Sequence, residues 1–147
     1  MTVDPEAPRP LAYAAALVVT IACLALANWI LAYLGELVNV EPGRPAAAAL
    51  AFAQGLAGAL LAAFACRQLF KSIRPADFWL KWIVLLFSVL FAVVLAWLVA
   101  TGKSERALNW TTYAGIAGLL GTEIGRRLAK GLLGRARAEH SSVRLPD

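Results

Sequence analysis

Four long apolar stretches most constrain what this chain can fold into. A helix needs roughly 20 residues to cross the ~30 Å hydrocarbon core of a bilayer, and each stretch comes close to or exceeds that length. Together they contain only two charged residues, Lys81 and Glu123. Apolar residues make up 61% of the 147, and a soluble fold of this size has too small an interior to bury so many of them away from water. The sequence therefore predicts an all-α membrane protein with four transmembrane helices, at residues 11–35, 46–66, 78–101 and 108–125.

The segments outside these spans complete the predicted organisation. Residues 1–10 form a short N-terminal segment, residues 11–133 the four-helix domain, and residues 134–147 a basic tail. The first span is expected to be retained as an anchor, because the leader carries Asp4 and Glu6 beside a single arginine and so differs from the basic start of a cleaved signal peptide.

The basic residues predict the orientation. If the N-terminus is inside, 11 of the 14 Lys and Arg residues lie on the inner side. Cytoplasmic loops carry such an excess, which predicts cytoplasmic N- and C-termini and a multi-pass protein of the inner membrane. The segment RRLAKGLLGRAR, residues 126–137, either bends onto the membrane surface and meets anionic headgroups or supplies only the positive charge that stops transfer of the chain. Trp79, Trp82 and Trp110 are typical of interfacial anchors.

Small residues are concentrated in the second and fourth spans. Glycine allows close approach of helix backbones, so these two helices are expected to pack together, whereas the third, rich in Leu, Val and Phe, should face lipid. Two short matches 60 residues apart suggest two tandem helical hairpins, although chance also explains them in so Gly-rich and Ala-rich a chain. The candidate packing residues are Gly55, Gly58, Gly115, Gly118, Gly121 and Gly125.

Four polar residues lie in or beside the spans. Glu123 is three and four residues before Arg126 and Arg127, so it either pairs with them on one helix face or serves as a coupling carboxylate. Asn28 and Gln54 lie at similar depth, which favours an interhelical hydrogen bond or a polar lining for a substrate. Glu36 is interpreted as a solvated boundary carboxylate. These are the candidate intramembrane or transport residues.

The usual groups of an enzyme site are missing. His140 is the only histidine, and the only cysteines, Cys23 and Cys66, are predicted at different depths. No phosphate loop or dinucleotide motif occurs, and every aspartate is expected in a loop or tail. No basic segment alternates with exposed aromatics as a single-strand-binding groove requires. We therefore expect no enzyme, no cofactor, no metal site and no nucleic-acid partner.

The hypotheses that remain are all membrane functions. The first is a non-enzymatic accessory or structural subunit of a membrane complex, or a homo-oligomer, that works through helix packing. The second is a small oligomeric transporter or ion channel, and the third, less favoured, is a holin-like pore. The layout is similar to that of small multidrug exporters and some phage holins, but the first span lacks the mid-membrane glutamate of the exporters.

Overall fold

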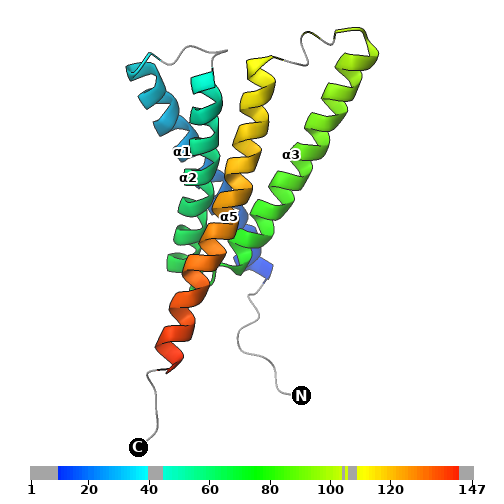
Figure 1. The fold of residues 1–147 in the computed structure, drawn as a ribbon. Coiled ribbons are helices and arrows are strands. Elements are labelled where there is room, and N and C mark those ends of the chain that lie inside the picture. Colours follow the sequence, from blue (N-terminus) through cyan, green and yellow to red (C-terminus); the bar gives the residue numbers. More distant parts are fainter. Residues whose placement is uncertain (1–9, 40–44, 104, 106–108, 143–147) are drawn as a thin grey trace, which may run out of the picture.

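The computed structural model describes residues 10–39, 45–103, 105 and 109–142, with side chains left out at residues 110, 111 and 134–142. Four long helices make up this part of the chain (Figure 1): α1 at Pro10–Leu37, α2 at Pro45–Phe70, α3 at Arg74–Ala100 and α5 at Trp110–Ser142. The prediction of an all-helical chain with four main helices is confirmed.

Three of the four helices have the length and apolarity needed to cross a membrane. These are α1, α2 and α3. Helix α5 has 33 residues, but Glu123, Arg126 and Arg127 interrupt its apolar part. It is therefore not apolar enough over a sufficient length to count as a candidate span. The protein is therefore a largely apolar helical bundle with three candidate membrane spans, and the fourth crossing stays a prediction.

Consecutive helices run in opposite directions. Figure 1 shows α1 and α3 running one way and α2 and α5 the other, so that α1 begins and α5 ends at the same end of the bundle. The three-residue turn from α2 to α3 lies there too, and we call this the turn end; the opposite end, where α3 stops at Ala100, is the far end. Lys71 begins the turn with a left-handed φ of 55°, a conformation that commonly stops a helix.

Helix α3 begins one turn earlier than predicted. The prediction placed its start at Phe78 and Asp77 in a loop, but Asp77 lies in the first helical turn, and its N–H donates to the carbonyl of Ile73 at 2.9 Å. Pro75 suits the first helical positions, and a carboxylate in the first turn interacts favourably with the helix dipole. The loop assignment of Asp77 is wrong for this reason, and Asp4 and Asp147 lie outside the described residues.

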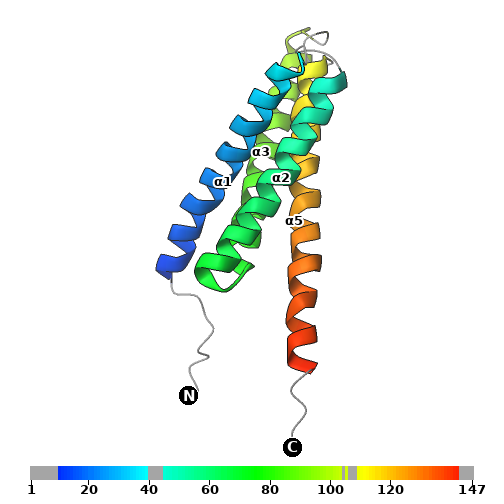
Figure 2. The ribbon, with the colours of Figure 1, turned by 90° about the vertical axis from the view of Figure 1, so that its left-hand side faces the viewer.

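Helix α5 also differs from the expected shape. Instead of bending after residue 125, it continues as one helix to Ser142 and extends beyond the turn end of the other helices (Figures 1 and 2). Leu128, Ala129, Lys130 and Leu132 are strong helix formers, and they outweigh the cost of about 1 kcal/mol for Gly131 in a helix interior. The basic segment therefore projects from the bundle.

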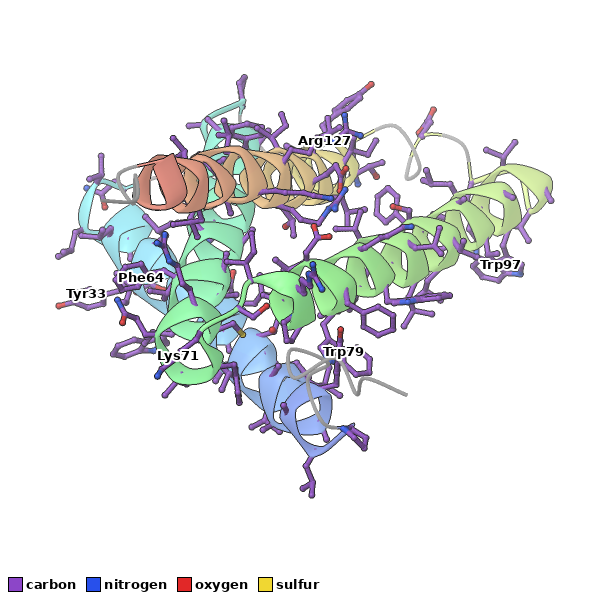
Figure 3. All side chains as sticks on the ribbon, turned by 90° about the horizontal axis from the view of Figure 1, so that it is seen from below. Tyr33, Phe64, Lys71, Trp79, Trp97 and Arg127 are labelled. Carbon is purple, nitrogen blue, oxygen red and sulfur yellow. The ribbon has the colours of Figure 1, made fainter. Side chains whose placement is uncertain are left out.

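Helix α3 packs against the other helices mainly near its start. Small residues dominate the buried core, and α3 contributes to it only near its start: Pro75, Ala76 and Leu80 are its only described buried residues. Beyond them α3 diverges from α1, α2 and α5 (Figures 1 and 3), and most of its large side chains are exposed. The expected exposure of the third helix is confirmed. The buried apolar residues of the described chain are Ala16, Ala27, Ala59, Ala62, Ala63, Cys66, Ala76, Leu80 and Ala129.

Candidate functional site

Glycines bring α2 and α5 into backbone contact. A Cβ atom added to Gly121 would overlap the carbonyl oxygen of Phe52 and lie 3.1 Å from the nitrogen of Leu56. At Gly125 it would lie 2.7 Å from the Leu56 oxygen. Such distances leave no space for a side chain. Within a membrane no hydrophobic force drives helices together, because lipid is as apolar as their side chains. They associate instead through close backbone approach at small residues.

The same contact includes one more glycine of α2. A Cβ atom at Gly55 would overlap the carbonyl oxygen of Gly118 and lie 2.7 Å from Thr122 Oγ1. That hydroxyl donates to the Gly118 oxygen of its own helix at 2.9 Å. It therefore needs no hydrogen-bond acceptor on α2. Gly118 itself is less crowded, because an added Cβ would meet only Ala51, at 3.5 Å or more.

The other two candidate glycines contact different neighbours. Gly58 faces α1, where an added Cβ would lie 2.8 Å from the Leu24 side chain, and Gly115 faces α3, where it would lie 3.0 Å from the Phe91 ring. In a symmetrical pair of hairpins, Gly58 and Gly118 would contact corresponding helices. Gly58 instead packs on α1 while Gly118 packs on α2, so the 60-residue repeat in the sequence does not extend to the packing.

An ion-pair cluster joins α3 to α5 near the turn end. The guanidinium of Arg126 donates from Nη1 to Asp77 Oδ1, and from Nε and Nη2 to Glu123 at 2.9 and 2.8 Å. The Arg126 side chain is only 14% exposed. Three charge-assisted hydrogen bonds of this kind are strong and geometrically specific, so Arg126 fixes the start of α3 against α5.

Two further cations complete the cluster. Arg127 Nε donates to Glu123 Oε1 at 2.7 Å, and Lys130 Nζ lies 3.8 Å from Asp77 Oδ2. Hydrogen bonds to Glu123 and Asp77 raise the pKa of the Arg126 guanidinium above its ordinary value, which favours its charged form. Both acids of the cluster are paired with protein cations.

The two intramembrane amides come together, but not side chain to side chain. Gln54 Nε2 donates to the backbone carbonyl of Asn28 at 3.3 Å, which links α1 and α2. Both residues line a cleft of about 430 Å³ between the helices, together with residues of α3 and α5. Among the residues that line it are Leu24, Phe87, Phe91, Gly115 and Leu119. Glu123 is not among them, so the structure separates the acidic candidate from the two amides.

Glu36 lies apart from both sites. It is exposed in the last turn of α1, at the far end. No hydrogen bond or ion pair joins its carboxylate to another residue in the part of the chain that the structure describes. Its position agrees with a carboxylate at a helix boundary and brings it near neither the ion-pair cluster nor the amides.

The two tryptophans at the start of α3 have different surroundings. Trp79 is half-buried, and its indole Nε1 donates to the backbone oxygen of Tyr13 in α1 at 2.7 Å. Trp82 is 52% exposed, and its ring packs edge-on against Phe78, with centroids 6.3 Å apart. Figure 3 shows Trp79 on the α3 segment near the start of α1. Trp79 therefore positions α3 against α1, while Trp82 has the exposure of an interfacial anchor.

This difference predicts unequal effects of the same substitution. Trp79→Phe removes the hydrogen bond to Tyr13 and should lower the free energy of unfolding by about 1 kcal/mol. Trp82→Phe removes no hydrogen bond and should change it by less than half as much. Thermal unfolding of both variants in mild detergent measures this, and equal losses would contradict the positioning role of Trp79.

Sequence reasoning missed Asp77 and Trp79 as parts of the site. A signal for Asp77 was present, since Arg-Pro-Ala-Asp combines a proline at a first helical position with an acid in the first turn. No local pattern predicts the contact of Trp79 with Tyr13, because 66 residues separate them.

The described residues of the site form helix contacts and charge pairs. Within the described residues, no group of three or more His, Cys, Asp or Glu side chains is placed to hold a metal ion. Comparisons of the chain with protein-family models, with curated protein sequences and with solved structures found no match.

Proposed function

We propose that this protein is a small, non-enzymatic membrane subunit that works through helix packing. The observation that carries the proposal is the arrangement of α3. This helix is attached to α1 and α5 near its start. Beyond Leu80 it diverges from them, keeps a contact with α5 through Phe91 and exposes most of its large apolar side chains. A helix held at one end presents its remaining length to a neighbouring helix, either in another protein of a complex or in a second copy.

The distribution of charge supports a proposed place and orientation in the inner membrane. The described cations of the turn end outnumber its two acids, Asp77 and Glu123. Because cytoplasmic segments carry an excess of basic residues, we place the turn end, and with it both termini, in the cytoplasm. Anionic headgroups are the proposed partners of this end. The cations are Arg67, Lys71, Arg74, Lys81, Arg126, Arg127 and Lys130.

One observation favours a transporter as the second candidate. The cleft beside Asn28 and Gln54 lies between helices, where transported molecules are commonly bound. Coupling to an ion requires a carboxylate that is free to bind it, however. Glu123 accepts hydrogen bonds from Arg126 and Arg127 and lies outside the cleft, so the geometry supports the packing role better.

Glu123→Gln separates the two candidates. Glutamine keeps the size of the side chain and one of its two acceptor oxygens, so under the packing role the variant should remain folded and lose about 1–2 kcal/mol of stability. Proton and cation flux would be measured in liposomes that contain the wild type, the variant or no protein, and all three should agree. Clear wild-type flux that vanishes in a folded Glu123→Gln variant would replace the subunit with a transporter.

A further inference from the structure

The intramembrane cleft contains hydrogen-bonding groups that the chain does not satisfy. The side-chain amide of Asn28 and Gln54 Oε1 both lack a hydrogen-bond partner among the described residues. Asn28 lies nine residues before the end of α1 at Leu37, which places it about 13 Å along the helix from that end. At such a depth water is scarce, and an unpaired polar group costs several kcal/mol.

The size of the cleft limits what can satisfy these amides. Its volume of about 430 Å³ falls within the roughly 300–1,000 Å³ of small-molecule pockets. The cleft is therefore large enough for one small molecule between the helices.

The lining defines the chemical class of the occupant. Apolar side chains such as Leu24, Phe87 and Leu119 form most of the wall, and no charged residue contributes to it. The ring of Phe91 reaches α5 where Gly115 leaves space for it. An apolar body would therefore lie against the leucines and phenylalanines, and an uncharged polar head against the two amides.

We propose that the cleft binds a neutral amphiphile, a lipid-like molecule whose carbonyl or hydroxyl head hydrogen-bonds to Asn28 and Gln54. The Asn28 amide donates to such a head, and Gln54 Oε1 accepts from it where it carries a hydroxyl. A charged head is disfavoured, because nothing in the lining compensates for its desolvation. The cleft borders the α2–α5 contact and α3, because Gly55, Gly118 and Phe87 also line it. The proposed ligand is nevertheless distinct from the partner helix of the packing role, and the two are tested by different experiments.

A photoreactive long-chain alcohol tests the site. Hexadecanol carrying a diazirine on its chain would be added to the full-length protein in lipid nanodiscs, and the labelled peptides would be identified by mass spectrometry. Labelling should saturate, should concentrate on cleft residues of α1 and α5 such as Leu24 and Leu119, and should be displaced by unlabelled hexadecanol. A trimethylammonium probe with the same chain should label the cleft weakly.

Three variants identify the groups responsible. Asn28→Leu removes the amide at similar size and should weaken labelling about three- to tenfold, the range expected for one intramembrane hydrogen bond. Ala114→Leu reduces the volume without touching the amides and should weaken it as well. Ser88→Leu removes an exposed polar group of α3 outside the cleft lining and should leave labelling unchanged.

Several outcomes would overturn the proposal. Labelling that never saturates, or that spreads evenly over the exposed residues of α3, would show contact with bulk lipid only. Labelling that is equal in Asn28→Leu and Ser88→Leu would show that the amide binds nothing. Cross-links between two copies through a cysteine at position 28 would show that a second copy meets the amide. If Asn28→Leu does not fold, retained labelling in Ala114→Leu is sufficient to reject the site.

Discussion

Gly121→Ala should lower the stability of the bundle by about 2 kcal/mol or more. The new methyl group would overlap the carbonyl oxygen of Phe52, and a backbone atom cannot move aside as the end of a flexible side chain can. The α5 and α2 backbones must therefore separate along their tightest contact. Overpacking of a well-packed interior typically costs about 1–3 kcal/mol, and a clash with backbone belongs at the upper end.

Two glycines of the same helix provide matched controls. At Gly118 an added Cβ makes ordinary contacts of 3.5 Å or more with Ala51, and at Gly131 nothing lies within 4 Å. Gly118→Ala should therefore be close to neutral, and Gly131→Ala should gain helix propensity. Thermal aggregation in mild detergent would rank the three variants. Equal losses in Gly121→Ala and Gly118→Ala would contradict the α2–α5 contact.

Arg126→Met should be the most damaging change in the ion-pair cluster. It leaves the carboxylates of Asp77 and Glu123, whose side chains are 27% and 24% exposed, without the cation between them. Breaking a buried pair costs about 3–5 kcal/mol. Because both acids retain some water contact and Arg127 and Lys130 remain, we expect about 2–3 kcal/mol here.

Arg127→Met is the control for this prediction. The Arg127 side chain is 75% exposed, so its pair with Glu123 should contribute less than about 1 kcal/mol. The double variant Asp77→Asn/Arg126→Met should lose less stability than the two single variants lose together, because the effects of residues in contact are not additive. Thermal unfolding of the four variants gives the coupling. Equal effects of Arg126→Met and Arg127→Met would contradict the role of Arg126 as the link between α3 and α5.

Local sequence was sufficient to predict the helices and the helix pair in closest contact. Apolar length alone predicted α1, α2 and α3, because a membrane span needs about 20 uncharged residues. The enrichment in glycine predicted that α2 and α5 pack together, since only small residues allow such approach. The spacing of Glu123, Arg126 and Arg127 predicted that they share one helix face, and the structure places them in hydrogen-bonding contact there.

Contacts between residues far apart in the sequence could not be predicted from the sequence. Asp77 meets Arg126 across 49 residues, and this contact depends on the angle at which α3 crosses α5. The hydrogen bond of Gln54 uses the carbonyl of Asn28 and not its side chain, which depends on how far α1 is rotated about its axis. The straight course of α5 past Gly131 was also not predicted, because leucines alternating with basic residues suggested a segment lying on the membrane surface, whereas the helix formers around Gly131 continue the helix.

Site-specific photocross-linking of α3 in native membranes tests the packing role most directly. A photoreactive amino acid at Val93, which is 60% exposed, should form a protein adduct of one defined mass, either with another membrane protein or with a second copy. The same group at Leu80, which is fully buried, should give only contacts within the chain. A subunit that works through helix packing predicts the defined adduct at Val93. Lipid adducts alone at Val93 and at the other exposed positions of α3, in a folded protein, would contradict it.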